Sequence, residues 1–251
     1  MLVRFSVENY RSFNKRQVFS MAAGKHTRHK EQIVSVNGKR LLKAGVLFGA
    51  NAAGKSNLIK AINFGRNVAL NEINSGRIVN RNFRIDSKSL QRPGVFQYDI
   101  WSNGHFYSYG FAISYLEAKF VSEWLYIIDG EKEKVVFERN EKGKVTTDIK
   151  FSNNENRQRF EIYSEDVSDE KSFLSEIVSH RLSEMEDFIP FFDVKKWFDS
   201  LIIIFPQTKF NDFRQFMMSD TLESMGKLLK YFDTGIDSLN GKEKSMDEIL
   251  G

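Results

Sequence analysis

The chain of 251 residues has no cysteine, only three prolines and no long apolar run. Without cysteine it can form no disulfide, no thiolate zinc site and no cysteine nucleophile. Its longest strongly apolar run, residues 201–205, is much shorter than the roughly 20 residues that cross a bilayer. The N-terminal segment carries charges at Arg4, Glu8 and Arg11 instead of an apolar signal region. We therefore expect a cytoplasmic protein with no secretory signal and no membrane contact.

Apolar residues and positive charge are plentiful by comparison. Hydrophobic residues make up 41% of the chain and 23 residues are phenylalanine, which excludes a disordered protein. Residues 1–60 hold twelve Lys or Arg against two acidic residues, whereas the remainder is net acidic. A basic N-terminal segment suits nucleic acid, nucleotide phosphates or an acidic partner, and equally a solvated surface that the acidic part balances.

Alternating apolar and polar residues predict a β-rich first half. Turns are expected at Asn37-Gly38, Asn103-Gly104, Asp129-Gly130 and Lys142-Gly143, because such pairs tolerate a positive φ. Residues 2–8 alternate between apolar and polar side chains, whereas residues 44–48 are expected to form a short buried strand. The expected strands are residues 2–8, 17–22, 33–36, 40–42, 44–48, 96–101, 106–114, 119–128, 134–139 and 145–151.

Helical spacing dominates after residue 154 and appears once before it. Apolar residues recur at helical intervals in residues 55–73, 172–185, 190–198 and 221–232. Residues 201–205 are expected to form another buried strand, which Pro206 ends.

One motif carries clear chemistry, the glycine-rich loop GANAAGKS. It matches G-x-x-x-x-G-K-[ST], in which inward-pointing backbone N–H groups and a helix N-terminus bind phosphate. The lysine reaches the β- and γ-phosphates, and the serine hydroxyl binds Mg²⁺. The predicted strand before the loop and helix after it supply the context that this role requires. The predicted nucleotide ligands are Gly49, Ala50, Asn51, Ala52, Ala53, Gly54, Lys55, Ser56 and the adjoining Asn57, with Lys55 as the catalytic cation and Ser56 as the metal ligand.

These patterns predict an α/β fold with a P-loop NTPase core, and the resemblance described next implies the ABC-ATPase type of core. Residues 1–75 would hold the N-terminal strands, the phosphate loop and the first helix. Residues 76–152 would form an antiparallel β meander of the same domain, and residues 153–251 a helical region.

The sequence resembles the ABC-type ATPase heads of RecF, SMC and OLD proteins. It is most similar to prokaryotic AAA-family ATP-binding proteins that are often encoded in phage-defence loci. The resemblance rests on ENYRSF at residues 8–13, the loop GANAAGKSN, EWLY at 123–126, VFER at 136–139 and LLKYFDTGI at 228–236. It implies ATP and Mg²⁺ as ligands, Arg11 beside the loop as a nucleotide contact, and dimers that complete each other's sites. It covers nearly all of this chain but only the first part of a longer family member.

The catalytic features of such heads are missing from the sequence. No Ser-Gly-rich signature occurs, and the acidic strand end LYIID at residues 125–129 continues with Gly130 rather than Glu. We interpret Asp129-Gly130 as a hairpin turn, and His180 as a surface or interface residue rather than a switch. Gln207 is a candidate for a metal- and water-sensing glutamine. The chain is therefore expected to be a truncated, fragmentary or split ATPase that hydrolyses ATP weakly or not at all.

Two other functions stay open at this point. A self-contained P-loop kinase or GTPase would use the same loop, although the nearest guanine-type string, residues 208–211, lacks the final Asp. A non-catalytic interaction fragment could also retain the loop. As a switch in phage defence or in DNA or RNA transactions, the protein would need a homodimer or a partner protein that supplies the second half.

Overall fold

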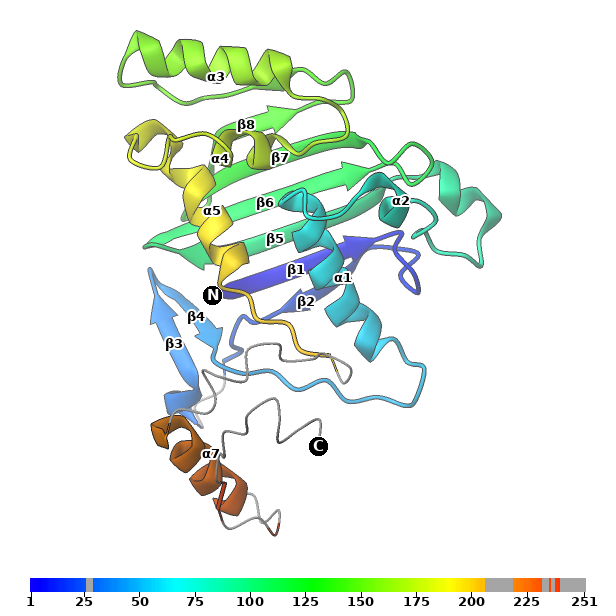
Figure 1. Cartoon of the computed structure of the whole chain (residues 1–251), viewed down its shortest axis with the longest axis vertical. Helices are drawn as coiled ribbons and strands as arrows, with labels where there is room; N and C mark the ends of the chain where they lie inside the picture. Colours follow the sequence, from blue (N-terminus) through cyan, green and yellow to red (C-terminus); the bar gives the residue numbers. More distant parts are fainter. Residues whose placement is uncertain (26–28, 206–218, 232–234, 236–237, 240–251) are drawn as a thin grey trace, which may run out of the picture. The chain divides into compact units, whose positions relative to one another are not determined.

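The computed structural model describes residues 1–25, 29–205, 219–231, 235 and 238–239. It contains one unit at Met1–Ile203 and another at Ile204–Gly251. In the second unit the structure describes helix α7 (Ser219–Tyr231). All that follows concerns the first unit, whose elements are labelled in Figure 1.

A seven-stranded antiparallel sheet organises this unit, in the order β2-β1-β5-β6-β7-β8-β9. The N-terminal strand β1 pairs with β5, so the start of the chain extends the meander. A separate two-stranded ribbon is formed by β3 (Ile33–Val36) and β4 (Lys39–Leu42). The strands of the large sheet are β1 (Leu2–Glu8), β2 (Gln17–Ser20), β5 (Gly94–Ser102), β6 (His105–Ile113), β7 (Phe120–Asp129), β8 (Lys132–Arg139) and β9 (Val145–Thr146).

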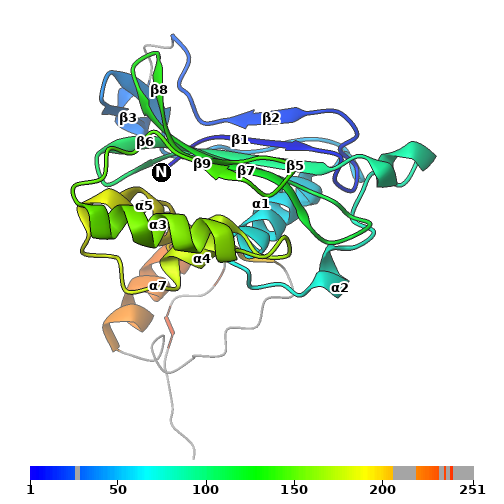
Figure 2. The ribbon, with the colours of Figure 1, turned by 90° about the horizontal axis from the view of Figure 1, so that it is seen from above.

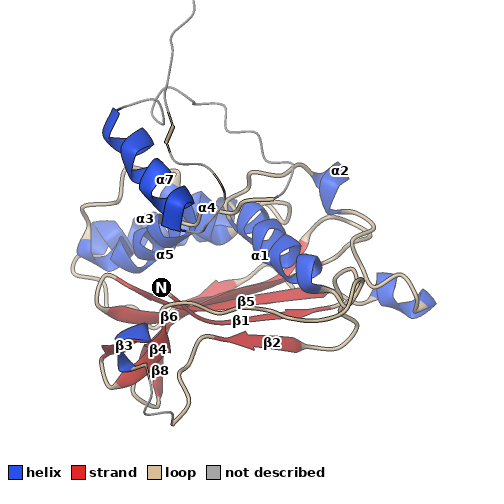
Figure 3. Cartoon of the chain, turned by 90° about the horizontal axis from the view of Figure 1, so that it is seen from below, coloured by secondary structure: helices blue, strands red, loops and turns tan. Residues whose placement is uncertain are grey.

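The helices of this unit lie on one face of the sheet, as Figures 2 and 3 show. Helix α1 follows the glycine-rich loop, and the others come from the ends of the meander. They are α1 (Lys55–Ala69), α2 (Ser75–Ile78), α3 (Asn154–Asp166), α4 (Phe173–Val178) and α5 (Ile189–Asp199). Short 3-10 turns occur at Lys30–Gln32, Ser87–Gln91 and Glu186–Phe188.

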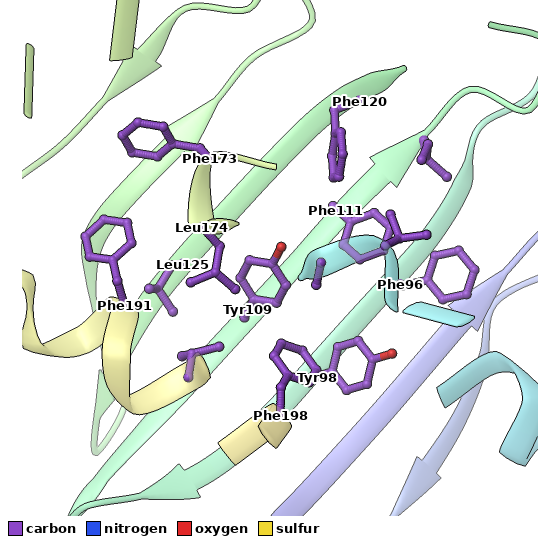
Figure 4. Packing of buried hydrophobic residues seen from close by; sticks show 14 of the residues in the cluster. Phe96, Tyr98, Tyr109, Phe111, Phe120, Leu125, Phe173, Leu174, Phe191 and Phe198 are labelled. Carbon is purple, nitrogen blue, oxygen red and sulfur yellow. The ribbon is translucent and has the colours of Figure 1, made fainter. Parts of the chain in front are cut away.

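The core between sheet and helices is built from aromatic rings (Figure 4). Phe96 and Phe111 stack across β5 and β6 with centroids 5.3 Å apart. Phe137 of β8 stacks on Phe191 of α5 at 5.4 Å. Such offset and edge contacts stabilise a core beyond its buried area alone. The buried phenylalanines of this unit thus form the contact layer between the sheet and its helices.

Helix α1 is held against the sheet at Gly65. The Tyr98 hydroxyl donates to the Ile62 carbonyl at 2.8 Å, and a Cβ at Gly65 would collide with that hydroxyl. Arg66 donates to the Phe198 carbonyl at 2.9 Å, which ties α1 to α5. The absence of a side chain at residue 65 therefore fixes how closely the loop-bearing helix approaches β5.

A buried carboxylate organises the other end of the helical layer. The backbone N–H groups of Phe173 and Leu174 donate to Glu123 at 2.6 and 3.1 Å, and the Tyr109 hydroxyl donates at 2.9 Å. Glu123 therefore caps the start of α4. Burial raises the pKa of Glu123, although these donors and nearby Arg139 oppose the shift.

Arg139 secures the segment that enters α4. Its guanidinium donates to the carbonyls of Lys171 and Ser168 at 2.9 and 3.0 Å and pairs with Asp169 at 3.0 Å. The guanidinium is almost completely buried, so its donors are satisfied where water cannot reach.

The predicted meander and both early hairpin strands agree with the structure to within a few residues, except that β9 ends at Thr146. The expected helix at 172–185 is wrong in length, because α4 ends at Val178. Two buried strands were predicted that the structure does not form. Residues 44–48 and 201–205 have no strand pairing among the described residues, and Phe48 and Ile202 are 90% and 83% exposed. An apolar strand needs a neighbour on each side, and the described sheet offers none.

The contact at Gly65 predicts a substitution effect opposite to helix propensity. Alanine at a helix interior usually stabilises by about 1 kcal/mol relative to glycine. Gly65→Ala should instead lower the free energy of unfolding by about 1–3 kcal/mol, because the methyl group displaces α1 from Tyr98. Urea denaturation measures this, and adding Tyr98→Phe should recover part of the loss. A stabilised single variant would contradict the packing described.

The pKa of Glu123 predicts a pH dependence of stability. A carboxyl whose pKa is raised by folding stabilises the fold below its usual pKa, and this contribution is lost as the pH rises through the raised value. Relative to Glu123→Gln, the wild type should lose stability with increasing pH above about 4.5, by at most about 1.4 kcal/mol per pH unit. Denaturation curves of both proteins across this range test it, and a constant difference would refute it.

Candidate functional site

The glycine-rich loop lies at the exposed N-terminus of α1. Residues 49–53 are exposed, and Gly54 and Lys55 are half-buried where the helix begins. Gly54 is the residue before the helix and adopts φ 94°, a left-handed conformation that favours glycine. Ala52 also has a positive φ, 64°, although it carries a side chain. Both residues turn the loop so that the chain enters α1.

The start of α1 offers free backbone donors. Within the described residues, the N–H groups of Gly54, Lys55 and Ser56 have no protein acceptor, and the first bonds of the turn run from Asn57 and Leu58 to the Gly54 carbonyl. Unpaired amides at a helix N-terminus, together with the positive end of the helix dipole, attract anions. The loop therefore has the donors that a phosphate group requires.

The Lys55 ammonium lies across the loop. It donates to the carbonyls of Gly49 and Ala50 at 2.6 and 2.8 Å. These two contacts join the side chain at the start of α1 to the first residues of the loop. The role of Lys55 and the loop residues as nucleotide ligands stays a prediction.

Ser56 is exposed in the first turn of α1. No cluster of three or more His, Asp or Glu side chains that could hold a metal occurs in the part of the chain that the structure describes. A Mg²⁺ ion at Ser56 would therefore depend on phosphate oxygens and water for its other ligands, which Mg²⁺ readily accepts. The exposed hydroxyl fits that role.

The turn that contains Arg11 lies beside the loop. Asn57 of α1 donates to the Ser12 hydroxyl at 2.9 Å, and a Cβ added at Gly54 would lie 3.4 Å from that hydroxyl. The Arg11 backbone N–H donates to the Arg81 carbonyl at 2.9 Å, and its Nε donates to the Tyr10 hydroxyl at 3.1 Å. Burial raises the pKa of Tyr10, against the opposing effect of Arg11, so this phenol stays neutral.

A pocket of about 460 Å³ opens next to this turn. Arg11, Ser12 and Asn57 form one side of it, and residues 80–85 form the other. Sequence reasoning missed residues 80–85, since they form no motif of their own. The signal available was the pair Arg81 and Arg84 in a segment otherwise rich in asparagine and apolar residues.

The structure also describes the surroundings of two further candidates from the sequence, Asp129 and His180. Asp129 pairs with Lys132 in the β7–β8 hairpin and Gly130 has φ 62°, so the turn interpretation is confirmed. His180 contacts Glu176 at 3.0 Å and stacks on Tyr163 with centroids 3.9 Å apart. Gln207 lies outside the described residues.

The two positive-φ residues of the loop should respond to substitution with opposite signs. Ala52→Gly relieves a left-handed alanine and should raise the free energy of unfolding by up to about 1 kcal/mol. Gly54→Ala introduces the same strain at the start of α1 and should lower it by about 1–2 kcal/mol. Urea denaturation of the two variants decides the matter. Effects of the same sign would show that the loop does not have this conformation.

Comparison with known proteins places the chain in a family. Residues 46–238, more than half of the chain, match a family model described as "AAA domain, putative AbiEii toxin, Type IV TA system". The match starts just before the loop and includes residues 80–85. No curated protein matches the chain. Among the described residues, no helix combines the length and the apolar character needed to cross a membrane. The chain therefore belongs to the AbiEii toxin-like AAA domains, a defence-associated family of ATPase-like P-loop proteins.

Proposed function

We propose that this protein binds Mg-ATP at the N-terminus of α1 and acts as a nucleotide-dependent switch. The observation that carries the proposal is the group of free amides at Gly54, Lys55 and Ser56 next to the Lys55 ammonium. In this proposal, the loop amides hold the β- and γ-phosphates, and Lys55 neutralises their charge. Asn57 and Arg11 contact the nucleotide from the neighbouring turn.

Mg²⁺ belongs to the same proposal. The Ser56 hydroxyl would hold the ion, and the ion would neutralise the phosphate oxygens that the loop amides orient. The Lys55 ammonium donates to the Gly49 and Ala50 carbonyls of the loop. On nucleotide binding, it would exchange these two acceptors for phosphate oxygens.

A second polypeptide segment would complete the site. Val46, Leu47 and Phe48 precede the loop and are 74%, 44% and 90% exposed. Within the described part of the chain, the backbone groups of residues 44–48 form no backbone hydrogen bond. An exposed apolar stretch with free backbone groups pairs readily with an added strand. We assign this role to a segment of a second copy in a homodimer, or to a partner protein that supplies the C-terminal half of an ABC-type head.

Hydrolysis by this chain alone is proposed to be weak or absent. Phosphoryl transfer to water needs a group that positions the water and cations that stabilise the transition state. The acidic candidate of the sequence, Asp129, belongs to a hairpin turn. ATP binding would then change how the chain interacts with a partner in the cytoplasm. The process served would be phage defence or a DNA or RNA transaction. The basic N-terminal segment suits a nucleic-acid partner.

A self-contained kinase or GTPase remains the alternative use of this loop, and a non-catalytic interaction fragment is the third. Base preference distinguishes a GTPase, turnover with an added acceptor distinguishes a kinase, and absence of nucleotide binding distinguishes the fragment.

Removing the loop cation should abolish nucleotide binding without loss of the fold. Lys55→Ala should reduce the affinity for Mg-ATP by at least about 100-fold, because the β- and γ-phosphates lose their cationic partner. Its thermal stability should stay close to that of the wild type, since the exposed loop carries little packing. Calorimetric titration measures the affinity, with Lys43→Ala as a charge-matched control before the loop. Retained ATP affinity in Lys55→Ala would refute the assignment.

A further inference from the structure

The pocket beside the loop has the composition of a nucleoside site. Nine residues line it, namely Arg11, Ser12, Asn57, Asn80, Arg81, Asn82, Phe83, Arg84 and Ile85. Three are arginines, whose planar guanidinium groups can stack on a base, and none is acidic. Three are asparagines. The amide groups of Asn57 and Asn82 donate to the hydroxyls of Ser12 and Ser89 at 2.9 and 2.6 Å, which leaves their carboxamide oxygens and the Asn80 side chain to pair with the edge of a base. Two are apolar, Phe83 and Ile85, and their side chains suit the flat faces of a base; the ninth is Ser12.

The pocket is held in place by a buried side chain. Asn9 is fully buried and donates to the carbonyls of Ser89 and Arg92 at 2.7 Å each. Its oxygen accepts the Phe83 backbone N–H at 3.1 Å. Because these bonds join the end of β1 to residues 83–92, the wall of the pocket is tied to the large sheet. The segment is therefore positioned before any ligand arrives.

The pocket and the loop share a wall. Asn57 lines the pocket and lies two residues after Lys55, and its bond to Ser12 joins the two sites. If Lys55 holds the β- and γ-phosphates of a nucleotide, its α-phosphate and nucleoside could extend along the shared wall at Asn57. The nucleoside of such a ligand would then leave the loop on the side where the pocket opens.

We infer that this pocket binds the base and ribose of a nucleoside triphosphate, with Arg81 and Arg84 as the residues that separate a nucleotide from a bare phosphate chain. The inference rests on the proposed function of the loop. Arg84 is exposed and makes no ion pair or side-chain hydrogen bond within the described residues, so its planar guanidinium is free to stack on a base. Arg81 is half-buried and bonds to the Arg77 carbonyl at 3.0 Å, which orients it along the wall.

The test compares Mg-ATP with Mg-tripolyphosphate, which has the phosphate chain without the nucleoside. The wild type should bind Mg-ATP at least about tenfold more tightly, since stacking of one base contributes on that scale. The double variant Arg81→Ala/Arg84→Ala should lose most of this preference and keep its affinity for Mg-tripolyphosphate. Lys88→Ala removes a positive charge from the same segment outside the pocket and should change neither affinity.

The outcomes separate this inference from the function of the loop. If the double variant keeps the preference for Mg-ATP, or weakens both ligands equally, the pocket does not bind the nucleoside. In both cases the loop still binds phosphate, and the proposed function stands. If the wild type binds neither ligand, the proposed function fails and this inference fails with it. Since tripolyphosphate has no base, a loss restricted to Mg-ATP cannot come from a general change of charge.

Discussion

The close contact between α1 and β5 at Gly65 determines where the phosphate loop lies. Tyr98 donates to the Ile62 carbonyl across this contact, and no side chain at residue 65 separates the helix from the sheet. A helix held this way along one turn is held along its whole axis, so its N-terminus projects from a fixed point. The free amides of Lys55 and Ser56 are therefore oriented by the aromatic core, not by the loop that displays them.

The same principle applies to the pocket beside the loop. Asn9 and Tyr10 lie just beyond β1, and their side chains bond to residues 83–92 and to the Lys60 carbonyl of α1. One turn after a single strand thereby aligns the Arg11 side of the pocket, the opposite wall and the first helix. Glu123 and Arg139 similarly hold the start of α4 in place through bonds to Phe173 and Lys171. Buried polar groups with all their bonds satisfied specify such arrangements because an alternative packing would leave charges unpaired.

The parts of the fold that the sequence predicts well are those that local signals determine. Asn37-Gly38 and Asp129-Gly130 fix hairpin turns through backbone preferences, so the strands on either side were located well. The motif from Gly49 to Ser56 predicts a phosphate loop for a comparable reason, since each residue type has a local task, and its ligand stays a prediction. EWLY and VFER contain Glu123 and Arg139, and the structure gives both residues a structural role at the start of α4.

The failures concern interactions between distant segments. Residues 44–48 have the composition of a buried strand, yet burial depends on neighbouring strands that the described residues do not provide. The pocket depends on Arg11 meeting Arg81 across 70 positions of the chain, which no periodicity reveals. Likewise, the importance of Gly65 depends on Tyr98, a residue of another element. The division of the chain at residues 75 and 152 stays a prediction.

The most direct measurement is a titration of the purified chain with Mg-ATP in which released phosphate is assayed in the same samples. The account predicts saturable binding with no phosphate release above that of the Lys55→Ala variant. This result would establish that the chain binds the nucleotide and does not turn it over by itself. Brisk phosphate release would contradict the account, because this chain would then contain the catalytic group assigned to a partner. If the chain does not bind Mg-ATP, the glycine-rich loop is not a nucleotide site.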